Sequence, residues 1–301
     1  MINLFDEKSE NYINNFCNEI KLPEKAYEEV YNLYLKASKE KSLGDKIIKY
    51  AEALYKRSGV DLIRQSVKND PKTEGLNALL AMIIASNETK ALYAKHCIPD
   101  KIFYDTMSDI TIWVGNFYED TGFYGISDLG WLTNHLNLRL FRLERLQFEF
   151  SSYEEYPELE KLCDLPQSLK KGDPALSVHI PQGEKLDFEA CENSYKKVKQ
   201  FFPEFYPDFH FKCCVCHSWL LSPLLKDILP ESSNIIKFQN KFKILYLDKE
   251  SDQYKERIFG RSFESMKVYP TDTSLQKATV KYIENGGKLG GGYGVIFASD
   301  L

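Results

Sequence analysis

The sequence predicts an α+β protein, in which a helical N-terminal part precedes a mixed β-sheet with flanking helices. Up to about Phe117, apolar residues recur at spacings of three and four, the period of helices that bury one side. Residues 138–150 alternate instead, as a strand with two different faces does. From Leu176 to Asp248, short apolar strands alternate with helices. We therefore predict a helical domain at residues 1–137 and a sheet domain at residues 138–301.

Composition and charge limit the classes of function. The 301 residues are 43% hydrophobic and 28% charged, which is typical of globular domains. A net charge of −5 without a basic stripe does not indicate nucleic-acid binding. The longest apolar runs are too short for a bilayer, and the N-terminus has no signal-peptide core. We expect a cytoplasmic protein with seven reduced cysteines and no nucleic-acid or membrane partner.

The helical part predicts a bundle of five to seven helices. Pro23 begins the second helix, and Gly44 separates it from a third. Further helical stretches cover residues 76–85, 88–96 and 101–117. Apolar stripes of this kind usually pack a core, and a role in covering a substrate cleft is the less favoured interpretation.

Residues 138–150 predict an antiparallel hairpin or one long bent strand. Their charged side chains, which include Arg142, Arg145 and Glu149, need partners if they are buried. Cross-strand ion pairs at a sheet surface are the simpler interpretation, and a role toward substrate is the alternative.

The stretch from Leu176 to Asp248 contains three strands and their connecting helices. Asp187 is a good N-cap for a helix that we expect to stop at Pro203, and the next strand covers residues 209–221. Helices between apolar strands imply crossover connections and a largely parallel core. Ligands gather beyond the carboxyl ends of such strands, where His179 and His217 lie.

The C-terminal residues predict one more helix and one more strand. Thr271 or Asp272 caps the helix, Gly286 ends it, and residues 293–298 form the strand. The glycines after Gly286 follow a helix and precede a strand, which is the wrong order for a phosphate-binding loop.

Cys213, Cys214, Cys216 and His217 invite a metal interpretation, which strand geometry disfavours. Alternate residues point to opposite faces, so four ligands on one short strand cannot converge on one ion. We expect buried thiols and no metal. A Cys216 nucleophile assisted by His217 is disfavoured for the same reason.

Five stretches resemble a family of acyltransferases with a helical N-acyltransferase N-terminal domain and a GNAT-like C-terminal domain. They are HLNLRLFRLERLQFE, LSVHIPQGEKLDFEAC, CHSWLL, SSNIIKFQNKF and DTSLQKATVKYIENGGKLGGGYG. The resemblance implies a GNAT-like mixed sheet and transfer of an acyl group from coenzyme A or acyl-CoA, such as acetyl-CoA, to an amine acceptor that the sequence does not identify. The strand that ends at Pro181 would line the pantetheine, and the loop after it would face the diphosphate.

The resemblance also implies which residues bind the cosubstrate. The implied residues are Val178, Ile180, Gln182, Gly183, Glu184, Lys185 and Leu186. The typical loop of this superfamily carries two spaced glycines, whereas only Gly183 is present here. Glu184 and Asp187 repel a diphosphate, and Lys185 offsets only part of that. A catalytically silent GNAT-like ligand-binding or regulatory protein is therefore the alternative function.

Four residues near the strand ends are candidates for catalysis. Glu149 or His217 would accept the proton that the amine loses, and His179 or Ser218 would protonate the departing thiolate. A single histidine is more often a hydrogen-bonded core residue, so position and a pKa near neutrality are what favour the two histidines. The leading prediction is direct acyl transfer within a ternary complex, without a covalent intermediate.

Overall fold

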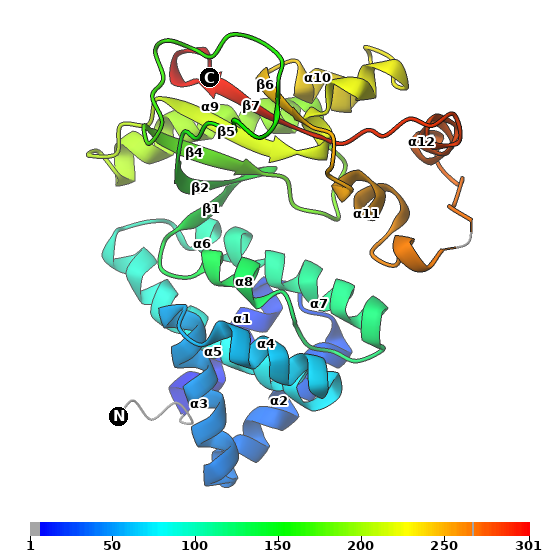
Figure 1. Cartoon of the computed structure of the whole chain (residues 1–301). Coiled ribbons are helices and arrows are strands. Elements are labelled where there is room, and N and C mark those ends of the chain that lie inside the picture. The colour runs from blue at the N-terminus through cyan, green and yellow to red at the C-terminus, as the bar shows by residue number, and fades with distance from the viewer. Residues whose placement is uncertain (1–6, 267) are drawn as a thin grey trace. The chain divides into compact units, whose positions relative to one another are not determined.

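The computed structural model describes residues 7–266 and 268–301 (Figure 1). The chain forms two compact units. Unit 1 comprises residues 1–143 and 181–183, and unit 2 comprises residues 144–180 and 184–301. An α+β fold was predicted and is confirmed. The domain boundary at residue 138 stays a prediction. Within the described ranges, no helix is long and apolar enough to cross a membrane.

Unit 1 is built from helices. Their bounds are α1 (Glu7–Glu19), α2 (Glu24–Lys39), α3 (Lys41–Lys56), α4 (Val60–Asn69), α5 (Pro71–Lys95), α6 (Asp100–Met107), α7 (Asp109–Thr121), α8 (Leu129–Leu132) and the 3-10 helix η1 (Thr133–His135), followed by strand β1 (Leu140–Leu143). Helix α5 is buried on all sides from Ala78 to Ser86, which is typical of a central helix. Its N-cap is Asp70, whose carboxylate accepts a hydrogen bond from the N–H of Thr73 (3.1 Å), and Pro71 occupies the first helical position.

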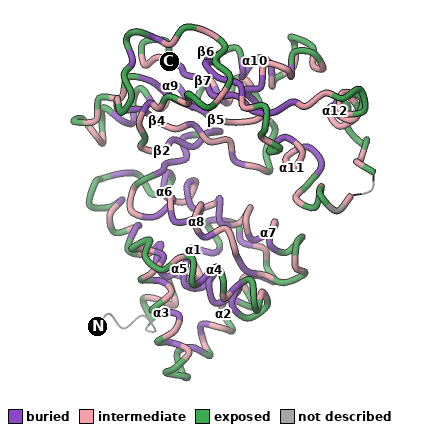
Figure 2. Tube along the Cα trace, in the orientation of Figure 1, coloured by how far each residue is buried: buried purple, intermediate pink, exposed green. Residues whose placement is uncertain are grey.

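Unit 2 contains the sheet. Its elements are β2 (Leu146–Ser152), β3 (Glu160–Lys161), β4 (Pro174–His179), α9 (Phe188–Phe205), β5 (Cys213–Ser218), η2 (Trp219–Leu221), η3 (Pro223–Asp227), α10 (Asn234–Gln239), β6 (Lys243–Asp248), α11 (Gln253–Phe259), η4 (Phe263–Ser265), α12 (Ser274–Glu284), β7 (Gly291–Phe297) and η5 (Ala298–Asp300). Within this unit, the strand order is β2-β4-β5-β7-β6-β3. Strand β7 is buried from Gly291 to Ile296, as Figure 2 shows by its colour, because it lies between β5 and β6.

The sheet is mixed, so the predicted largely parallel core was wrong. Strands β4 and β5 are parallel, whereas β2–β4, β5–β7, β6–β7 and β3–β6 are antiparallel. Among the described strands, β4 and β5 alone are parallel neighbours, and helix α9 is the crossover between them. The sequence pattern shows that a helix separates two strands but not whether those strands become neighbours, and here β6 pairs with the later strand β7.

Three predicted helix boundaries were also wrong. Gly44 lies buried inside α3 and does not precede it. Helix α9 continues two residues beyond Pro203, where the N–H of Tyr206 donates to the carbonyl of Phe202 (2.8 Å) and buried Phe202 holds the last turn. The cap of α12 is Thr273, because Gln276 completes a capping box with it.

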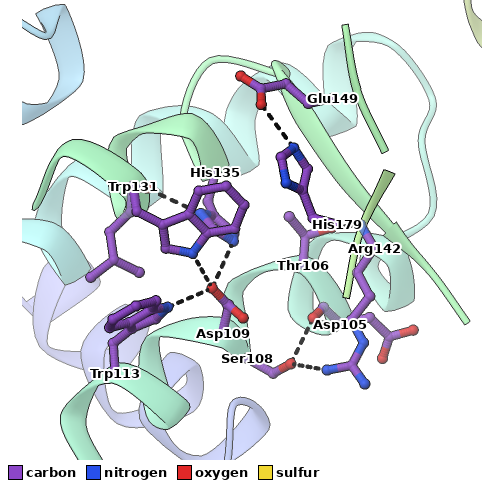
Figure 3. A network of polar contacts seen from close by, with 11 residues as sticks. Asp105, Thr106, Ser108, Asp109, Trp113, Trp131, His135, Arg142, Glu149 and His179 are labelled. Atoms are coloured by element: carbon purple, nitrogen blue, oxygen red, sulfur yellow. Dashed lines mark hydrogen bonds and ion pairs between the residues drawn. The ribbon is translucent and has the colours of Figure 1, made fainter. Parts of the chain in front are cut away.

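A buried carboxylate joins α7 to the segment that follows it in unit 1. Oδ2 of Asp109 accepts hydrogen bonds from the indoles of Trp131 (2.8 Å) and Trp113 (3.0 Å), and Nε2 of His135 lies 3.2 Å away (Figure 3). The side chains of Asp109 and His135 are 3% and 0% exposed. Burial alone would raise the pKa of Asp109, but these donors together lower it below its usual value.

Asp109→Ala should destabilise unit 1 by about 3–5 kcal/mol, because the buried His135 and two half-buried indoles lose this acceptor. The lowered pKa also fixes the pH dependence. The stabilisation by the carboxylate is complete above the unfolded pKa of about 4 and disappears as pH falls through the lower folded value. Urea unfolding of both proteins between pH 7 and pH 3 should show the difference shrinking with acid.

The control for this prediction is Asp105→Ala, which removes a half-buried carboxylate that pairs with Lys101 one helical turn away. That change should cost less than about 1 kcal/mol. Equal losses for the two variants would contradict an anchoring role for Asp109.

Candidate active site

The parallel strands β4 and β5 separate at their carboxyl ends. Their register pairs Ala175 with Cys213 and Ser177 with Val215, and it goes no further, although β4 continues to His179 and β5 to Ser218. Beyond that point, the facing backbone edges of the two strands are not joined to each other. The sheet therefore opens where the sequence predicts the site.

Two of the predicted catalytic residues meet on one sheet face. Glu149 lies opposite Ser177 in the β2–β4 register, and His179 is two residues beyond Ser177, so all three share a face. Oε2 of Glu149 lies 3.0 Å from Nε2 of His179 (Figure 3). The side chains are 18% and 28% exposed, so the pair is accessible to water or substrate.

His217 points to the same face from β5. Val215, two residues before His217, pairs with Ser177 of β4, so His217 lies on the face of Ser177, Glu149 and His179. On its other side, His217 pairs with Tyr293 of β7. Nε2 of His217 lies 3.6 Å from Oδ2 of Asp248, a carboxylate at the end of β6 that sequence reasoning missed. The ring of Tyr156 is tilted against the imidazole of His217, with 5.6 Å between the ring centroids. The two residues that approach His217 are 31 and 61 positions away, so no local pattern could reveal them.

Ser218, Cys214 and Cys216 lie on the face of β5 opposite His217. The hydroxyl of Ser218 accepts a hydrogen bond from the N–H of Leu220 (3.2 Å) and caps η2. Strand alternation turns Cys214 and Cys216 to the face opposite His217, and both are buried. Burial raises the pKa of the Cys216 thiol to about 12. Among the described residues, no group of histidines, cysteines and carboxylates could hold a metal ion.

The loop after β4 leads directly into helix α9. Gly183 has φ +91°, a conformation that favours glycine, and a Cβ built there would meet nothing within 4 Å. The side-chain oxygen of Gln182 accepts a hydrogen bond from Asn116 (2.9 Å). Asp187 is the N-cap, as predicted, because its carboxylate accepts from the N–H of Ala190 (2.9 Å). The loop therefore ends at a helix N-terminus, where anions are favoured.

Arg145 donates hydrogen bonds to this loop and was not among the predicted site residues. It is 5% exposed, and its guanidinium donates to the carbonyl oxygens of Glu184 (2.8 Å) and Lys185 (3.0 Å). The sequence signalled only that a charged residue in residues 138–150 needs a partner. The nature of that partner, two backbone carbonyls 39 and 40 residues away, depends on the tertiary fold.

Comparison with solved structures shows that this fold is known. An acyltransferase in complex with decanoyl-CoA and teicoplanin has a TM-score of 0.74 at 19% identity, over 95% of this chain and 87% of the other. An acyltransferase mutant in complex with octanoyl-CoA has a TM-score of 0.72 at 19% identity, over 94% of this chain and 87% of the other. An acyltransferase in complex with CoA and 10C-teicoplanin has a TM-score of 0.74 at 18% identity, over 95% of this chain and 87% of the other. A search of curated proteins found no match.

Comparison with protein families covers nearly all of the chain. Residues 140–296 match the GNAT-like C-terminal domain, and residues 11–138 match the N-acyltransferase N-terminal domain. The first match alone spans more than half of the 301 residues and includes every strand of unit 2 except the last residue of β7. The chain therefore belongs to the family of acyltransferases that join an N-acyltransferase N-terminal domain to a GNAT-like C-terminal domain.

Proposed function

We propose that this enzyme transfers an acyl group from an acyl-CoA to the amine of an acceptor. The observation that carries the proposal is the separation of β4 from β5 beyond Ser177 and Val215. A backbone edge without a partner strand can pair with an extended ligand, as peptides pair with sheet edges. The two amide groups of pantetheine suit such an edge.

The proposed cosubstrate site follows β4 into α9. Val178 and Ile180 would face the pantetheine, and the diphosphate would lie against the loop and the helix N-terminus. The loop residues of this site are Gln182, Gly183, Glu184, Lys185 and Leu186. The cap bond of Asp187 engages one of the two carboxylates that would repel a diphosphate.

The acyl group that we propose is a medium-length chain. The structurally similar acyltransferases are complexes with decanoyl-CoA and octanoyl-CoA, and this favours such chains over the acetyl group that the resemblance alone implied. One of those complexes also contains teicoplanin, and this favours a large amine-bearing molecule as the first kind of acceptor to test here.

The proposed chemistry is a single displacement at the thioester. The amine nitrogen attacks the carbonyl carbon, the C–N bond forms, the C–S bond breaks, and coenzyme A leaves as a thiolate. Glu149 takes the amine proton directly or through water, and His179, within hydrogen-bond distance of it, protonates the thiolate. His217 beside Asp248 is a second candidate base, and Ser218 a second candidate acid.

Calorimetry with coenzyme A, acetyl-CoA, octanoyl-CoA and decanoyl-CoA tests the proposal. We expect binding of coenzyme A and tighter binding of the two longer thioesters, because each buried methylene adds about 0.8 kcal/mol. Absence of heat and of any thermal shift at millimolar ligand would refute the site. Binding without thiol release, for a broad panel of amines, would favour the catalytically silent alternative.

Glu149→Gln should lower turnover by about a hundredfold or more while leaving acyl-CoA binding unchanged, because the amide cannot accept a proton. The loss should shrink as pH rises, since the amine then deprotonates unaided. Release of the coenzyme A thiol measures the rate. Glu204→Gln, an exposed change near the end of α9, is the control. A deficit that is independent of pH would exclude Glu149 as the base.

Cys216→Ala should keep turnover within a few-fold, about 1 kcal/mol in the barrier. The thiolate is the reactive form of cysteine, and burial raises the pKa of this thiol to about 12. Mass spectrometry of the enzyme mixed with acyl-CoA should find no acylated Cys216. An acyl adduct at this residue, or a folded but inactive variant, would replace direct transfer by a covalent mechanism.

A further inference from the structure

Arg145 lies at the turn between β1 and β2 and holds two consecutive carbonyls of the loop before α9. Its Nε donates to the oxygen of Lys185 at 3.0 Å, and its Nη2 donates to the oxygen of Glu184 at 2.8 Å. The donors of a guanidinium form a rigid planar fork. Because the arginine is 95% buried, water does not compete freely for these bonds, and the two peptide groups are held in one orientation.

The arginine is itself fixed to the first turns of α9. Its backbone N–H donates to Oγ of Ser194 (3.0 Å), and that hydroxyl donates to the carbonyl of Ala190 (3.0 Å). The N–H of Ala190 in turn donates to the capping carboxylate of Asp187. The turn, the helix start and the loop therefore share one set of hydrogen bonds.

This orientation determines where the loop's N–H groups point. In a trans peptide, the C=O and N–H of one plane point in opposite directions. Since the carbonyls of Glu184 and Lys185 face Arg145, the N–H groups of Lys185 and Leu186 face away from it. Consecutive N–H groups beside a helix N-terminus form a concavity that binds anions.

We infer that Arg145 is a positioning residue that sets the loop for the diphosphate of coenzyme A without touching the ligand. This inference rests on the proposed function, because it assumes that coenzyme A lies on the loop. Lysine at this position would keep the charge, but its single ammonium cannot reproduce the fork that holds both carbonyls.

The test compares Arg145→Lys and Arg145→Gln with the matched control Arg142→Lys. Arg142 is the other strongly buried arginine of residues 140–146 (9% exposed), and its guanidinium donates to Oγ of Ser108 in unit 1 (3.3 Å). Calorimetry should show that coenzyme A binds tenfold or more weakly to both Arg145 variants and within twofold of wild type to the control. Pantetheine, which lacks the diphosphate, should bind all four proteins within twofold when it displaces coenzyme A.

Hydrogen exchange supplies a second readout. The amides of Lys185 and Leu186 should exchange faster in Arg145→Lys than in the control, and coenzyme A should protect them less. Arg145→Lys carries the test alone if circular dichroism shows that Arg145→Gln is unfolded. Unchanged coenzyme A affinity, or equal weakening of coenzyme A and pantetheine, would overturn the inference. Failure of wild type to bind coenzyme A would instead refute the proposed function and the inference with it.

Discussion

The three-residue parallel pairing of β4 with β5 is the constraint on which the site depends. Parallel neighbours cannot be joined by a tight turn, so the chain must leave β4, cross one face of the sheet and return. Helix α9 is that crossover. The loop at Gly183 and the helix N-terminus therefore lie directly beyond β4, at the end where the pairing stops. The short pairing of β4 with β5 thus leaves two strand edges open and places the loop and the positive end of the helix dipole beside them.

Strand alternation separates the polar groups from the thiols of Cys214 and Cys216. The register places Glu149, His179 and His217 on one face, where two carboxylate–imidazole pairs form. The opposite face holds Cys214 and Cys216, and burial raises the pKa of both thiols. The carboxylates and imidazoles are thus partly exposed while these two thiols are buried, an arrangement compatible with the direct transfer that we propose.

The sequence predicted local features well and tertiary ones poorly. The strand before His179, the cap at Asp187 and the strand predicted at residues 293–298 follow from short patterns. All three form, the last of them as β7 from Gly291 to Phe297. Strand order could not be predicted, because pairing joins segments far apart in the chain. The capping box at Thr273 and Gln276 was recognisable from its spacing, but we placed the cap earlier.

The candidate site was predicted in part for the same reason. Strand ends can be located from apolar runs, so His179 and His217 were correctly placed near the ends of their strands, and their roles stay a prediction. The contacts of Arg145 and Asp248 and the three donors around Asp109 join positions that only the folded chain brings together. Buried charged residues thus signal that a partner exists, and the structure is needed to say which one.

The position of β7 has a consequence for how the protein is made. A ribosome produces β5 and β6 before β7, yet β7 lies between them and pairs with both. During translation, therefore, each of these two strands has one backbone edge whose native partner strand does not yet exist. Such edges are where nascent chains associate wrongly, and pairing over long sequence separations is slow. We expect the nascent sheet to need shielding by a chaperone until the residues from Gly291 onward emerge.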